Sequence, residues 1–314
     1  MDLIHFRVVV PPALTRAAVE LLAPNDRVFN LVLVRAADAA DGDALECDVM
    51  RGAANGVLGE LRELGVDRAG SIAVGDVDMM FSQHAERIEA EQPAALVHAP
   101  LWAAVEAHIR AGGTYPPSFY LFLVIAGLIG SVGIVTNSQI LVVAAMVVGP
   151  EYSAITSVAL GVDRRNRRRI WAGTRALTAG FALAIAVTLV FAALVRVAGL
   201  QSTAFELGVR PVSHLIDTPD FFSVAVAVLA GVVGIVSLTE ARGSALLGVF
   251  ISVTTIPAAS DIAVSVAFAD WHQAWGSLVQ LLLNVLVLVV VGVLTLRLQR
   301  LLWRRAARRA GAPG

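Results

Sequence analysis

The chain has 314 residues, a mean hydropathy of +0.74 and only 16% charged residues, and the apolar residues are concentrated in the C-terminal two thirds. This composition is typical of an integral membrane protein. Lysine is absent, which excludes a Walker-type phosphate loop and a Schiff-base lysine, and the single Cys47 excludes an internal disulfide and a cysteine metal cluster.

Charge divides the chain into two halves of different character. Residues 1–117 hold nine arginines against seventeen acidic residues, whereas residues 118–314 hold fifteen arginines against eight acidic residues. We therefore expect an acidic soluble part followed by a basic membrane part.

The first 80 residues alternate between strand and helix patterns. We expect a hairpin loop at 37–43 between the second and third strands, and elements in this order: strand 3–10, helix 12–22, strand 27–34, strand 44–50, helix 53–64 and strand 70–74. This βαββαβ order predicts a ferredoxin-like α+β cytoplasmic domain over residues 1–80, a fold that hosts many sensor domains without implying binding. Residues 81–117 are amphipathic and interrupted by Pro93 and Pro100, which indicates a helical linker.

Residues 118–298 read as a six-helix transmembrane domain, and residues 299–314 as a basic cytoplasmic tail. The expected spans are 118–136, 138–160, 171–198, 221–239, 243–269 and 275–298. Arginines cluster between the second and third spans and in the tail, so both belong inside by the positive-inside rule. The protein is therefore expected in the cell inner (plasma) membrane as a multi-pass protein with both termini cytoplasmic.

Two of these spans carry polar interruptions that a simple anchor would avoid. The second contains Gly149, Pro150 and Glu151 near its centre, and the fifth contains Ile256 and Pro257 at mid-span. Proline breaks or kinks a helix, and a carboxylate at membrane depth is costly unless it faces water or a partner.

A short internal repeat relates the two halves of this domain. Residues 126–130 (AGLIG) match residues 230–234 (AGVVG) 104 positions later, and Pro150 corresponds to Pro257 at 107 positions. Each half would hold three spans, and an odd number of crossings inverts the second copy, which predicts a 3+3 inverted repeat.

The interruptions define a candidate site for a solute or ion, because broken helices leave backbone groups that lipid cannot satisfy. Its expected lining is Gly149, Pro150, Glu151, Ser153, Thr254, Thr255, Pro257, Ser260 and Asp261, with Glu151 and Asp261 as cation ligands or proton carriers. The alternative is that the prolines only kink helices for packing, with each acid satisfied by a hydroxyl or by Arg175 or Arg242. Gln280 and Asn284 lie four residues apart on the last helix and either hydrogen-bond across the bundle or line the path.

Other chemistry finds no support in the sequence. The six histidines show no paired metal-ligand spacing, and there is no G-x-S-x-G elbow or dinucleotide glycine pattern, so we expect neither a metal site nor an enzyme. The sequence indicates no particular cofactor. The arginine runs lack aromatic interleaving, which favours contact with the lipid bilayer over nucleic-acid binding.

Three motifs carry a family resemblance: residues 133–138 (GIVTNS), residues 144–155 (AAMVVGPEYSAI) and residues 246–264 (LLGVFISVTTIPAASDIAV), together with Gln280 and Asn284. In these the chain resembles the bacterial membrane family named domain of unknown function 389, especially its actinobacterial type. The resemblance implies a soluble cytoplasmic N-terminal domain followed by a hydrophobic multi-span domain, and it implies no activity.

The functional hypothesis is an integral membrane transporter or channel-like permease for a small polar solute or ion, with a cytoplasmic regulatory domain. The alternative is a membrane-anchored sensor of a metabolite or nucleotide, or an oligomeric scaffold. Glycine-rich helix faces predict a homo-oligomer, a dimer or trimer.

Overall fold

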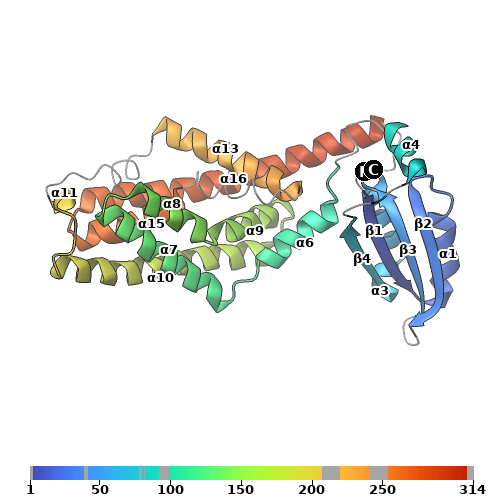
Figure 1. Cartoon of the computed structure of the whole chain (residues 1–314), viewed down its shortest axis with the longest axis horizontal. Coiled ribbons are helices and arrows are strands. Elements are labelled where there is room, and N and C mark those ends of the chain that lie inside the picture. Colours follow the sequence, from blue (N-terminus) through green and yellow to red (C-terminus); the bar gives the residue numbers. More distant parts are fainter. Residues whose placement is uncertain are drawn as a thin grey trace. The chain divides into compact units, whose positions relative to one another are not determined.

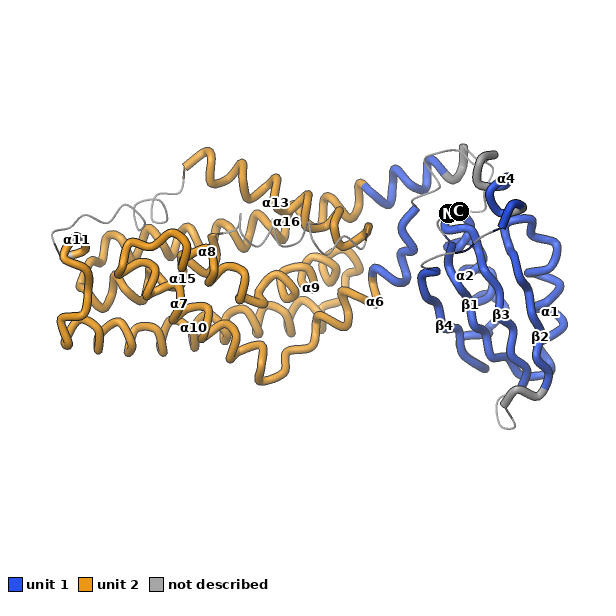
Figure 2. Tube along the Cα trace, viewed as in Figure 1, with its two compact units in different colours: residues 1–105, 299–314 blue, residues 106–298 orange. Residues whose placement is uncertain are grey.

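The computed structural model describes residues 3–38, 42–77, 80, 82–91, 99–206, 220–240 and 254–309. The chain divides into two compact units, one formed by Met1–Val105 with Gln299–Gly314 and the other by Glu106–Leu298 (Figure 2). Each unit is considered by itself.

Unit 1 contains an antiparallel sheet of four strands in the order β2-β3-β1-β4. The strands are β1 (Leu3–Val10), β2 (Val28–Asp38), β3 (Gly42–Met50) and β4 (Ser71–Asp76), and the helices among them are α1 (Pro12–Leu22), α2 (Arg51–Glu63) and the short α3 (Val66–Ala69) (Figure 1). The expected alternation of strands and helices is confirmed, with α3 added before β4.

The side chains of β1 alternate between two environments, as the two-residue period of a strand requires. Phe6 and Val8 are fully buried in a core with residues of α1 and α2. On the opposite face, His5 Nδ1 lies 2.8 Å from Asp48 Oδ1 on β3. The sheet therefore buries one face under its helices.

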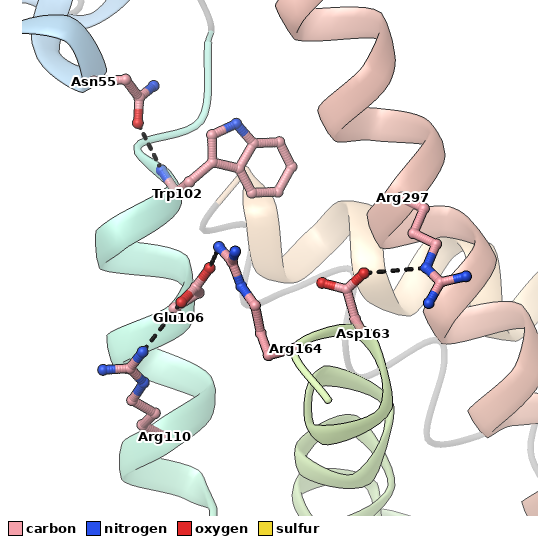
Figure 3. Close-up of polar contacts among 7 residues, drawn as sticks. All are labelled: Asn55, Trp102, Glu106, Arg110, Asp163, Arg164 and Arg297. Atoms are coloured by element: carbon pink, nitrogen blue, oxygen red, sulfur yellow. Dashed lines mark hydrogen bonds and ion pairs between the residues drawn. The ribbon is translucent and has the colours of Figure 1, made fainter. Parts of the chain in front are cut away.

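The linker expected at 81–117 contains two described helices, α4 (Gln83–Glu91) and α6 (Trp102–Gly112), and Pro93 lies outside the described residues. Asn55 on α2 fixes the start of α6, because its Oδ1 accepts a hydrogen bond from the Trp102 N–H at 3.1 Å (Figure 3). Its Nδ2 also donates to the Pro100 carbonyl at 2.9 Å. The Asn55 side chain thus satisfies backbone groups at the N-terminus of α6, as a helix-capping residue does.

Unit 2 is helical throughout its described secondary structure (Figure 1). Its elements are α7 (Pro117–Val135), α8 (Gln139–Val148), α9 (Glu151–Asp163), α10 (Arg167–Val197), α11 (Thr203–Glu206), α13 (Phe221–Thr239), α15 (Thr255–Ala267) and most of α16 (Trp271–Arg309). Helix α15 packs against both α7 and α10. Glycines on α7 permit this closeness: a Cβ at Gly130 would overlap the Ser260 side chain, and one at Gly127 would lie 2.7 Å from Thr188 Oγ1.

Among the described residues, four helices, α7, α10, α13 and α16, are long and apolar enough to cross a membrane. A fifth span results if α8 and α9 count as one, since together they pass the same test but are bent by 50°. The span expected at 243–269 is described only in part. Its second half contains α15, an apolar helix of 13 residues, and residues 243–253 lie outside the described part. Four to five helices of the described part are therefore compatible with membrane spans, against the six expected.

Candidate functional site

The predicted interruption of the second span is confirmed. Helix α8 ends at Val148 and α9 begins at Glu151, with Gly149 in an extended conformation (φ −67°, ψ 131°) between them. Pro150 lacks an N–H and cannot continue the α8 hydrogen-bond ladder, which accounts for the break. A Cβ at Gly149 would lie 2.7 Å from Ile256 Cγ1, so the absence of a side chain lets α15 approach the break.

Glu151 is the first residue of α9 and is only 6% exposed. Its Oε1 accepts a hydrogen bond of 2.7 Å from the hydroxyl of Thr255, the first residue of α15. Its Oε2 is buried and has no hydrogen-bond partner among the described residues. The buried Glu151 carboxylate thus links the start of α9 to the start of α15, and its second oxygen accepts no hydrogen bond from the described residues.

Two amide side chains of α16 meet the same end of α15. Asn284 Nδ2 donates to Thr254 Oγ1 at 2.8 Å, and Gln280 Nε2 lies 3.4 Å from the same oxygen. Gln280 Oε1 is buried and has no hydrogen-bond partner within the described ranges. Because Thr254 and Thr255 are adjacent, the amide pair and the carboxylate converge on the first residues of α15. The prediction that Gln280 and Asn284 bond across the bundle is supported by these contacts.

Asp261 forms a second polar group nearly two turns further along α15, and it is fully buried. Its Oδ2 accepts a hydrogen bond of 2.6 Å from Ser277 Oγ on α16 and lies 3.4 Å from Ser265 Oγ. Ser277 was not among the expected site residues. It lies three positions before Gln280, on the same helix face, and that spacing is the signal that could have identified it.

Three further expected site residues have contacts with the backbone or a place in a first helical turn. Ser153 Oγ donates to the Pro150 carbonyl at 2.8 Å, and Ser260 Oγ lies 3.0 Å from the Ile256 carbonyl and 3.1 Å from the Gly127 carbonyl. Pro257 lies in the first turn of α15, and residues 243–253 of the same expected span lie outside the described part. Proline is tolerated in a first turn, because the first N–H groups of a helix have no intrahelical acceptor.

Among the described residues, the Thr255 hydroxyl bonds Glu151 Oε1 and no arginine pairs with this carboxylate. Arg175, one of the two arginines proposed as alternatives, lies on α10 beside the exposed Trp171, and Arg242 falls outside the described residues. Within the described ranges, no group of three or more His, Cys, Asp or Glu side chains could hold a metal ion.

Ion pairs gather at the end of unit 2 where the connection between α9 and α10 lies (Figure 3). Arg164 pairs with Glu106 of α6, which also accepts a hydrogen bond of 3.2 Å from Arg110, and Arg297 of α16 lies 3.3 Å from Asp163. The Glu106 side chain is only 10% exposed, so this carboxylate lies in a partly desolvated position between two guanidinium groups.

Long apolar helices, a span broken at a proline and a carboxylate buried at that break are together typical of α-helical integral membrane proteins. Residues 146–290 match the family model described as "Domain of unknown function (DUF389)". The matched segment contains the break and the polar groups of α15 and α16, and the match agrees with the resemblance in the sequence motifs. No curated protein and no solved structure shows a significant match to the chain.

Proposed function

We propose that this protein is an integral membrane transporter or channel-like permease for a small polar solute or ion, built from two inverted halves of three spans, with a ferredoxin-like regulatory domain and both termini in the cytoplasm. The observation that carries the proposal is the hydrogen bond between Glu151 and Thr255, which joins two helix starts inside an apolar bundle and leaves one carboxylate oxygen unsatisfied.

Helix bounds support the internal repeat. Helices α7 and α13 are 19 residues each and both begin and end 104 positions apart. Helices α9 and α15 are 13 residues each, with the same offset at both ends, and the starts of α10 and α16 also differ by 104. At an offset of 104 residues, Pro150 is equivalent to Thr254. This equivalence replaces the earlier pairing of Pro150 with Pro257, which was based on the two prolines alone.

The connections between these helices support the same offset. Arg165 and Ala269 both have positive φ, at 52° and 61°. The next residues, Asn166 and Asp270, each donate their N–H to a carbonyl five residues earlier at 2.8 Å, and each caps the following helix with a side-chain oxygen. Asparagine and aspartate are both preferred helix N-caps. The two loops therefore have the same backbone conformation and the same capping contact, with a different residue in each.

Tryptophan placement supports the inversion. Trp171 and Trp275 occupy equivalent positions near the starts of α10 and α16, and they are 71% and 67% exposed. Tryptophan prefers the membrane–water interface, and inverted halves would place these two rings at opposite interfaces. From Trp275 to Arg297, α16 rises about 33 Å, which matches a hydrocarbon core of about 30 Å.

The same offset makes Glu151 and Thr255 equivalent residues of the two halves. Equivalent residues of an inverted repeat meet near the axis that relates them, at the depth where transporters of this architecture bind their substrates. The polar groups of Thr254, Gln280 and Asn284 extend this meeting point into α16. Alternating exposure of this point to the two sides would move a bound solute across the membrane.

Reconstitution of the purified full-length protein in liposomes tests the proposal with a panel of labelled ions and small polar solutes. We expect at least one flux above that of protein-free liposomes, and a reduction of that flux in Thr255→Val. Thr178→Val is the matched control, because Thr178 is exposed and bonds only to its own helix. Absence of any flux would contradict the permease and would favour the membrane-anchored sensor or scaffold.

A further inference from the structure

The surroundings of Glu151 restrict what its free oxygen can bind. Oε1 is occupied by the Thr255 hydroxyl at 2.7 Å. Oε2 lies close to the position that a Cβ of Gly149 would take, and that same position is 2.7 Å from Ile256 Cγ1 and 2.9 Å from Ile256 Cδ1. The unsatisfied oxygen therefore faces a glycine and an isoleucine at the helix break.

No opposite charge compensates this carboxylate in the described part of the chain. Helix α8 contains no titratable side chain, and Gln280 and Asn284, the polar groups of α16 that reach the start of α15, are neutral amides. The nearest titratable groups along α9 and α15 are Tyr152 and Asp261, neither of which is a cation. An ionised carboxylate without a counter-ion is costly in such a site.

The described residues around Oε2 suit a proton better than a metal cation. Ions that leave water exchange their hydration shell for several protein oxygens. Within the described ranges, the hydrocarbon of Ile256 and the Oε2 atom both border the space beside Gly149, and the Thr255 oxygen directs its hydrogen towards Oε1. A proton needs only one acceptor, and Oε2 supplies it.

We propose that Glu151 binds and releases the proton that drives transport, an inference that rests on the proposed permease function and specifies its coupling ion. In the uptake step, a lone pair of the Oε2 carboxylate oxygen forms an O–H bond with a proton from the aqueous phase on one side. Release to the other side breaks that bond and restores the carboxylate, with no change of oxidation state. Thr255 fixes the position of protonation, because its hydrogen bond to Oε1 leaves Oε2 as the oxygen that gains the proton.

Infrared spectroscopy of the full-length protein in lipid tests the protonation directly, without knowledge of the solute. We expect a protonated carboxyl C=O band that disappears as the pH is raised, shifts in deuterated water and is absent from Glu151→Gln. Asp261→Asn is the matched control, since it removes a buried carboxyl on α15 and should retain the band. The band would be retained in Glu151→Gln, or missing from the wild type at every pH, if the proposal were wrong.

A second measurement separates this inference from the permease function. Any flux found in the solute panel should increase several-fold when a pH gradient is imposed, and in Glu151→Gln the gradient should have no effect on it. A flux that ignores the gradient in the wild type would refute proton coupling and leave the permease standing. A titrating Glu151 band in a protein without any flux would refute the permease and leave Glu151 only as a protonation site.

Discussion

Gly149→Ala perturbs the helix break at the point where α8, α9 and α15 converge. The added Cβ would overlap Glu151 Oε2 and would lie 2.7 Å from Ile256 Cγ1, a side chain that is only 1% exposed. Overpacking of this kind costs about 1–3 kcal/mol. Alanine adopts the φ and ψ of Gly149 without strain. It also lowers the conformational entropy of the unfolded chain, which stabilises the folded protein by about 0.4–1 kcal/mol. The net expectation is a loss of about 1–2 kcal/mol.

Thermal unfolding of the purified protein in detergent measures this loss, and Gly59→Ala is the control. Gly59 lies within α2, where a Cβ would meet no atom within 4 Å, so alanine should stabilise that helix by about 0.5–1 kcal/mol. A Gly149→Ala protein that melts at or above the wild-type temperature would show that Ile256 is not held against the break, and the reasoning would then be wrong.

Three further predictions concern other parts of the chain. Burial, reinforced by Asp48, raises the pKa of the Cys47 thiol from its ordinary value of 9.0 to about 12. The unfolded thiol ionises first, so the stability that Cys47 contributes to unit 1 should fall as the pH rises from 9.0 towards 12, and a maleimide reagent at neutral pH should label Cys47 only after unfolding. Ser277→Ala removes the hydroxyl 2.6 Å from Asp261 and should lower the unfolding free energy by about 1–3 kcal/mol in denaturant titrations; an unchanged midpoint would contradict this. Glu106→Gln should weaken the pairing with Arg164 by about 1 kcal/mol or less and make proteolysis near α6 less dependent on salt, and equal salt dependence in both proteins would count against it.

The break at Gly149 and Pro150 could be predicted because its cause is local. A proline without an N–H after a glycine interrupts a helix in nearly any surroundings. Pro257 lies in the first turn of α15, where a proline is tolerated. The part of its expected span that precedes residue 254 lies outside the described residues, so the interruption expected there stays a prediction.

Contacts between distant residues could not be predicted. Glu151 and Thr255 are 104 positions apart, and their hydrogen bond depends on how α9 and α15 pack. Ser277 was missed because a serine within a strongly apolar helix hardly changes the hydropathy pattern, although its function as a donor to Asp261 follows at once from the packed structure. The sequence indicated which residues were unusual, and the packing determined which of them meet.

Opposite orientation of the two halves is the central claim, and site-directed labelling in intact cells tests it most directly. In a Cys47→Ser background, the Trp171→Cys and Trp275→Cys variants would be exposed to a membrane-impermeant maleimide. Both positions are exposed in the structure, and they are equivalent in the proposed repeat. We predict labelling of Trp275→Cys from outside and labelling of Trp171→Cys only after the membrane is permeabilised. Labelling of both variants from the same side would contradict the inverted arrangement.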